Sequence, residues 1–154
     1  MQIKEHLQIT GTALKGWLIA QAYDALAVGL LWLVGLLVLG VPLAPLWALL
    51  GALFQFIPVI GTVLALVGPA AAAAIGGELE LMLYVVILYV LIAATDGLLL
   101  QPYMLKRTVR VPIWASILTP LVMGIFLNVW GILLSIPLLA VLYAYRAHYR
   151  GRSS

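Results

Sequence analysis

Two acidic residues, Asp24 and Asp96, lie inside stretches that are otherwise apolar enough to cross a membrane. An acid exposed to lipid costs at least ~2.5 kcal/mol on insertion scales, so such residues usually face a protein interior or a wet cavity and often serve function. A carboxyl group there would suit proton or cation coupling. The alternative is structural: each is buried protonated or bonded to a neighbour such as Gln21 or Gln101. Function is favoured for Asp96, and both interpretations stay open for Asp24.

Two amide residues, Gln55 and Asn128, lie near the middle of two apolar segments that Gly and Pro interrupt. They could donate to a polar solute, or to backbone groups freed where a helix breaks, and the structural role is favoured. Pro58 and Gly61 break the first segment and expose backbone groups, which is either a fold requirement or a binding device. The candidate residues for a substrate or ion pathway are therefore Asp96, Gln55, Asn128, Pro58, Gly61, Gln101 and Asp24.

The sequence argues against an enzyme. Both histidines, His6 and His148, lie outside the apolar stretches, and the chain has no Cys. Neither a Ser–His pair nor an intramembrane zinc site can be built from these residues. We expect no catalytic residue, no metal and no cofactor.

Composition identifies the solvent of this chain. Of 154 residues, 66% are hydrophobic and 8% are charged, whereas charged residues make up about 25% of a soluble domain. The polar surface is too small to cover a water-soluble globule, so the partner is a lipid bilayer. A nucleic-acid site would need Lys and Arg gathered on a folded polar surface, so none is expected.

The pattern predicts an all-α polytopic membrane protein, since a spanning helix needs about 20 apolar residues. Two long membrane helices are each followed by a helical hairpin that Gly and Pro residues interrupt. We expect Trp32 and Trp130 to pack inside the bundle. The expected order is an amphipathic lead-in helix (1–16), a helix (17–40), a broken hairpin (43–76), a helix (81–104), a broken hairpin (112–145) and a basic tail (147–154).

The membrane domain, 17–146, thus reads as two similar units, 17–77 and 80–146. Broken segments at matching places in two halves are typical of a transporter's binding region. Each hairpin either dips in and returns, which would make an inverted repeat, or crosses twice; the sequence leaves both open. Placing the two termini and the basic loop 106–110 in the cytoplasm puts every Lys and Arg inside.

Several short motifs resemble the second half of the AI-2E transporter family, the autoinducer-2 exporters or PerM-like permeases. Their order and spacing cover nearly the whole chain. The motifs are Trp17-Leu18-Ile19-Ala20-Gln21, Gly35-Leu36-Leu37-Val38-Leu39-Gly40-Val41-Pro42, Phe56-Ile57-Pro58-Val59-Ile60-Gly61, Asp96 before Gln101-Pro102, Val111-Pro112, Gly124, Gly131 and Ile136-Pro137-Leu138.

The resemblance implies a multi-pass protein of the bacterial inner membrane, associated with export of small signalling molecules or, in some members, sodium–proton exchange. It places Asp96 where the family often has an acid or amide, and it carries nothing over to Asp24. Family members are about twice as long, with further membrane helices and a soluble segment ahead. We therefore expect a short form, a fragment or a split half, working as a homo-oligomer or with a missing N-terminal half.

The leading expectation is transport of a small solute or signalling molecule, with proton or sodium coupling left open. The alternative is a truncated or split transporter half that acts as an assembly module without transporting. The units would move relative to one another around the hairpin tips and Asp96.

Overall fold

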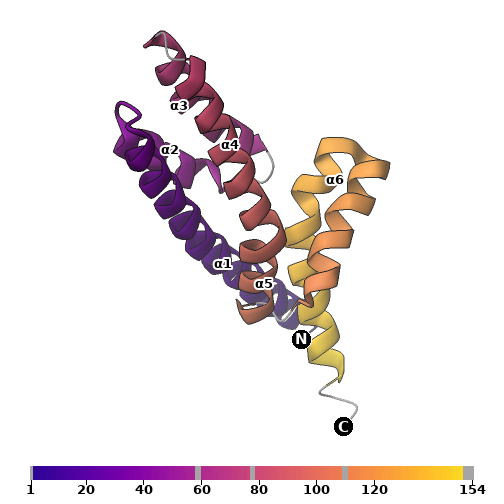
Figure 1. The fold of residues 1–154 in the computed structure, drawn as a ribbon. Coiled ribbons are helices and arrows are strands. Elements are labelled where there is room, and N and C mark those ends of the chain that lie inside the picture. Colours follow the sequence, from indigo (N-terminus) through magenta and orange to yellow (C-terminus); the bar gives the residue numbers. More distant parts are fainter. Residues whose placement is uncertain (1, 58–59, 77–78, 109–110, 151–154) are drawn as a thin grey trace. The chain divides into compact units, whose positions relative to one another are not determined.

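A computed structural model describes residues 2–57, 60–76, 79–108 and 111–150. Within these ranges the chain forms helices and no strand (Figure 1). Three helical stretches are long and apolar enough to cross a membrane: Ile3–Leu39, Leu79–Arg107 and Trp114–Arg150. The predicted all-α polytopic membrane fold is confirmed.

The chain divides into two compact units, which are described separately. The core unit is Ala22–Leu100, and the terminal unit is Met1–Gln21 together with Gln101–Ser154.

Helix α1 (Gln2–Leu39) runs for 38 residues without interruption. The segment expected as a separate lead-in helix is therefore the start of the same helix that enters the membrane. Gly40 ends α1 in the left-handed region, with φ 72°, where glycine carries no steric penalty. The N–H of Val41 donates to the Leu36 carbonyl at 3.0 Å, which closes the last turn. The predicted end at Gly40-Val41-Pro42 is confirmed.

The first hairpin consists of α2 (Ala44–Phe54) and α3 (Ile60–Ile75), which pack against each other. The 11 residues of α2 are about 16 Å long at 1.5 Å per residue. A bilayer core is about 30 Å thick, so α2 is too short to cross it. These lengths favour a hairpin that dips in and returns to the side where α1 ends and α4 begins.

The second long membrane helix is assembled from three consecutive elements. Helix α4 (Leu79–Thr95) packs against α3, and it continues into a π-helical turn, η1 (Asp96–Leu100), and then α5 (Gln101–Thr108). The helix predicted over 81–104 is thus confirmed, with a longer extent and a π turn that the sequence did not indicate.

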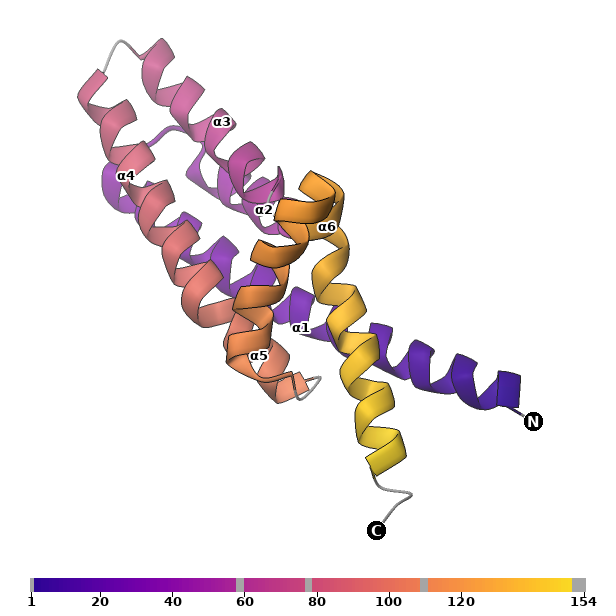
Figure 2. The same ribbon diagram turned by 90° about the vertical axis from the view of Figure 1, so that its right-hand side faces the viewer.

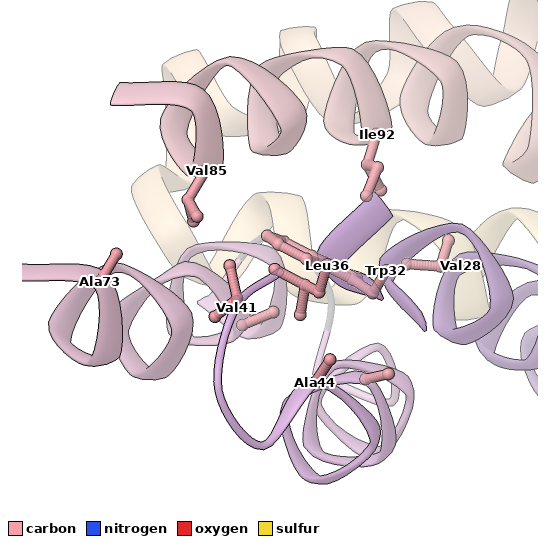
Figure 3. Close-up of a cluster of buried hydrophobic side chains, with 10 residues drawn as sticks. Val28, Trp32, Leu36, Val41, Ala44, Ala73, Val85 and Ile92 are labelled. Atoms are coloured by element: carbon pink, nitrogen blue, oxygen red, sulfur yellow. The ribbon is translucent and has the colours of Figure 1, made fainter. Parts of the chain in front are cut away.

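Apolar side chains from several helices form the interior of the core unit (Figure 3). Val28, Trp32 and Leu36 of α1 meet Val85 and Ile92 of α4 there. Trp32 is 2% exposed, which confirms its predicted burial.

Small residues let these helices approach closely, as is common where membrane helices associate. A Cβ added at Gly29 would lie 2.8 Å from the Cβ of Ala52 in α2. One added at Gly35 would lie 2.5 Å from a methyl carbon of Leu88 in α4. A larger residue at position 29 would therefore require α2 to shift, whereas one at position 35 would require the Leu88 side chain to move.

In the terminal unit, α6 (Ile113–Arg150) bends back at Asn128, where φ is 54° and ψ is −141°. Figures 1 and 2 show its two legs, drawn in orange and yellow, lying side by side. The predicted break of the hairpin 112–145 is confirmed, and it lies at Asn128. A small second core joins the two legs to α5. It consists of Leu105, Val111, Ala115, Ile136 and Leu139.

Trp130 follows directly after this bend and is 73% exposed. The prediction that it packs inside the bundle is wrong. In lipid an apolar side chain loses little by facing outward, so hydrophobicity alone does not identify the packed face.

A glycine secures each hairpin near its tip. A Cβ on Gly61 would overlap the carbonyl of Phe54, and one on Gly131 would overlap the carbonyl of Met123. In both hairpins the returning leg therefore packs directly on the last carbonyl groups of the entering leg. The two hairpins are thus closed by the same kind of contact; the inverted repeat of 17–77 and 80–146 stays a prediction.

Candidate functional site

Three polar residues that the sequence singled out come together in the core unit. Asp24 comes from α1, Gln55 from the turn after α2, and Asp96 from the first position of η1. They are 1%, 3% and 2% exposed, respectively. The side-chain amide of Gln55 donates from Nε2 to Oδ2 of Asp96 at 3.1 Å. The Asp24 carboxyl group lies close enough to Asp96 to interact with it electrostatically.

Helical spacing explains why both acids face inward. Asp24 precedes Val28 and Trp32 by one and two turns, so all three lie on one face of α1. Asp96 comes one turn after Ile92, whose side chain is buried in the core of this unit. The packing that buries the apolar face of each helix therefore also buries its acid.

The tip of the first hairpin brings the amide to the acids. Helix α2 ends at Phe54, and the N–H of Gln55 donates to the Ala52 carbonyl at 3.3 Å. This turn places the Gln55 side chain inside the unit, where it reaches Asp96. The hydrogen bond thus fastens the hairpin tip to the membrane helix that contains η1.

The π turn begins at the acid itself. A π-helix closes hydrogen bonds one residue further along the chain than an α-helix, and single π turns frequently occur at functional sites. The next residue, Gly97, has no heavy atom within 4 Å of the position that a Cβ would take. The backbone after Asp96 is therefore not confined by side-chain packing at this position.

The electrostatics of the acid pair limit what the site can hold. Like charges that are close together in a low-dielectric interior repel strongly, so both carboxyl groups cannot remain ionised without compensation. Neither oxygen of Asp24 receives a hydrogen bond of ordinary geometry from the part of the chain that the structure describes. One proton or one monovalent cation between the two groups would remove the repulsion.

The remaining candidate residues have other places in the fold. Gly61 packs on the Phe54 carbonyl, which is a structural role, and Pro58 lies outside the described residues. Gln101 begins α5 and is half-buried, while Asn128 is exposed at the bend of α6, in the terminal unit. Across the described ranges, no group of three or more His, Cys, Asp or Glu side chains is arranged to bind a metal ion.

Sequence reasoning missed a polar cluster in the terminal unit. Nε2 of His148 lies 2.8 Å from Oε1 of Glu5, and the His6 ring stacks on Tyr145 with centroids 5.6 Å apart. The Tyr145 hydroxyl also lies 3.2 Å from Oγ1 of Thr10. These contacts join the start of α1 to the end of α6. Residues more than 130 positions apart give no sequence signal of such pairing.

Comparison with known proteins identifies the family. Residues 1–151 match the sequence model of a family described as "AI-2E family transporter". The chain belongs to the AI-2E transporter family. Its relatives include "Putative transport protein YhhT" from Escherichia coli strain K12 and from Escherichia coli O157:H7, each 29% identical over 139 residues.

The alignment covers 88% of this AI-2E chain and 40% of each relative. The chain thus spans about two fifths of the length of these relatives. No solved structure matches it. The expected AI-2E resemblance is confirmed, and the family is one of membrane transporters.

Proposed function

We propose that this AI-2E family protein moves a small solute or signalling molecule across the membrane, and that Asp24, Gln55 and Asp96 form the ion or solute site. The buried contact between the hairpin-tip amide and a membrane acid pair carries this proposal. It supports coupling to protons or sodium, because binding a proton or a cation relieves the repulsion between the two carboxyl groups.

The contact also suggests how movement and binding are linked. Gln55 lies on a hairpin, whereas Asp96 lies on a long helix. A movement that separates the hairpin tip from this helix therefore breaks the hydrogen bond between them. A polar solute that competes for the Asp96 carboxyl group would release the hairpin tip. The site then changes its accessibility as the tip moves, in keeping with transporters that bind substrate at broken helices.

Flux in liposomes tests the proposal. Wild type, Asp96→Asn and Asp24→Asn are reconstituted, and proton and sodium fluxes are followed with pH-sensitive and sodium-sensitive dyes under imposed gradients. Glu80→Gln is the matched control, because Glu80 is an exposed acid of the same unit. We expect at least a tenfold loss of coupled flux in both Asp variants and less than a twofold change in the control. Unchanged coupled flux in Asp96→Asn would remove Asp96 from the mechanism.

A second candidate function is assembly without transport, as a split transporter half. Because the alignment covers 40% of each relative, the transport activity of a whole relative is itself a proposal for this chain. Co-expression with a segment that supplies the remaining part of such a relative distinguishes the two. Flux that appears only in the co-expressed complex favours the split half, and flux from the chain alone favours a self-sufficient homo-oligomer. For either function we propose the bacterial inner membrane, with both termini in the cytoplasm.

A further inference from the structure

The terminal unit has a groove of about 410 Å³ between the two ends of α6. One wall comes from the start of the first leg, with Pro112 and Trp114. The other comes from the last turns of the second leg, with Tyr143, Arg146, Ala147 and Arg150. The groove lies at the end of the hairpin that carries the basic residues Arg146 and Arg150.

Its charged lining suits a phosphate group. Arg146 and Arg150 are four residues apart, so their side chains project from the same face of α6. A guanidinium group presents a planar fork of donors that matches the oxygens of a phosphate or a carboxylate. No acidic residue lines the groove among the described residues. An anion that enters therefore meets a lining that contains two guanidinium groups.

The surroundings of the groove suit a lipid better than a free ion. Trp114 is 63% exposed, and tryptophan is enriched where membrane helices meet the headgroups. Leu142 lies one turn before Arg146 and is 55% exposed, while Leu118 on the first leg is 51% exposed. An acyl chain can lie along these leucines while the headgroup phosphate reaches the arginines.

A second groove in the same unit provides an internal comparison. It has a similar volume of about 410 Å³, but its lining includes Glu5 and His148. A carboxylate at its wall disfavours an anion. The two grooves therefore differ in charge rather than in size, and only the arginine-lined groove is complementary to a phosphate.

We infer that the groove lined by Trp114, Arg146 and Arg150 binds the headgroup of an anionic phospholipid. Basic pockets between membrane helices are a recurrent way of binding such headgroups. This inference does not depend on the proposed transport function, because it uses another unit and other residues.

Lipid retention by the purified full chain tests it. Dioleoyl phosphatidylglycerol or dioleoyl phosphatidylcholine is titrated into the protein in a neutral detergent, and native mass spectrometry counts the bound lipids. We expect wild type to retain the glycerol lipid at least tenfold more tightly than the choline lipid. The variant Arg146→Gln/Arg150→Gln should lose at least tenfold in affinity for the glycerol lipid. Lys4→Gln/Lys106→Gln, which removes the same charge from exposed positions outside the groove, should change it less than twofold.

Three outcomes would overturn the inference: equal retention of the two lipids by wild type, equal losses in the two double variants, or displacement of the lipid by millimolar inorganic phosphate. Displacement would mean that the groove takes a free anion. If the glutamine variant does not fold, Arg146→Lys/Arg150→Lys replaces it, since it keeps the charge and loses the fork. We expect that variant to bind the glycerol lipid threefold to tenfold more weakly than wild type, and an unchanged affinity would count against arginine recognition.

Discussion

At the scale of single residues, the hydrogen bond between Gln55 and Asp96 is the contact on which the candidate site depends. Both side chains are buried, and the donor–acceptor distance of 3.1 Å is ordinary for an amide and a carboxyl oxygen. Removing either side chain leaves the other one buried with one hydrogen-bond partner fewer. Such changes cost more than the bond itself contributes, because the remaining group keeps its desolvation penalty.

A double-mutant cycle measures this contact. We expect Gln55→Ala to lower the free energy of unfolding in detergent by about 1–3 kcal/mol. Adding Asp96→Ala should remove most of that effect, giving a coupling energy of about 0.5–2 kcal/mol, in the range of polar pairs in membranes. The cycle of Gln55→Ala with Glu80→Gln serves as the control and should be additive. Additivity in the Asp96 cycle as well would mean that the contact contributes nothing.

Asn128 has a backbone conformation that favours glycine, with φ 54° and ψ −141°. Such a conformation costs a non-glycine residue about 1–3 kcal/mol. We expect Asn128→Gly to raise the free energy of unfolding by about 1 kcal/mol, and Asn128→Val to lower it by at least ~2 kcal/mol, by thermal unfolding in detergent. A loss of stability in the glycine variant would show that the amide side chain stabilises the bend through its own contacts.

At the scale of elements, the hairpins depend on two glycines that touch carbonyl groups. The returning leg of each hairpin packs on its entering leg at Gly61 or Gly131. A methyl group at either place meets backbone, which cannot rotate away as a side chain would. The legs would have to separate, and the tip would then be displaced.

Alanine substitutions test this packing. We expect Gly61→Ala and Gly131→Ala each to destabilise the protein by about 2 kcal/mol or more, because overpacking costs typically 1–3 kcal/mol. Gly11→Ala is the control: no heavy atom lies within 4 Å of its added Cβ, so better helix propensity should stabilise by about 0.5–1 kcal/mol. Thermal unfolding in one detergent compares all three. Equal stabilities of the Gly11 and Gly61 variants would contradict the close contact.

Much of the element pattern could be predicted from sequence. The apolar run and the motif Gly40-Val41-Pro42 predicted the end of the helix, which the structure places at Leu39. The break at Asn128 followed from the Gly and Pro residues around it. The π turn could not be predicted, because one extra residue in a helix leaves composition unchanged. Trp130 was misplaced because lipid and protein interior are equally apolar, so hydrophobicity does not say which one a side chain faces.

The candidate site was predictable only in its parts. Asp24, Gln55 and Asp96 were each singled out because a polar side chain in an apolar stretch needs a reason to be there. Their meeting follows from how the helices pack, and Gln55 and Asp96 are 41 positions apart. No local pattern carries that information. The sequence favoured a functional role for Asp96, but it suggested Gln101 and not Gln55 as a hydrogen-bonding neighbour.

At the scale of the whole molecule, the exposed surface is that of a protein dissolved in lipid. Large apolar side chains such as Val38, Ile75 and Ile125 are 80%, 88% and 78% exposed. A soluble protein rarely exposes continuous apolar patches of this kind. The chain therefore needs a bilayer or detergent to remain folded.

The absence of Cys from the sequence makes the orientation directly measurable. Single-cysteine variants Glu80→Cys and Lys4→Cys introduce a thiol at exposed positions. With a membrane-impermeant maleimide, we expect Glu80→Cys to react in intact cells and Lys4→Cys to react only after the inner membrane is permeabilised, since the positive-inside rule places Lys4 in the cytoplasm. The reverse labelling pattern would invert the proposed topology.

The π turn at Asp96–Leu100 has a further consequence for how this chain can vary. In a regular helix each residue advances the side chains by about 100°. Compared with a regular helix of the same number of residues, the π turn therefore changes the direction in which the residues around Leu105 point relative to the residues around Ile92. Ile92 and Leu105 are both buried. Deleting one residue there would convert the turn into regular α-helix and leave the residues after it near their original orientation, because the turn accommodates the extra residue locally. A further insertion in the regular helix beside the turn would instead rotate the residues that follow by about 100° relative to their neighbours.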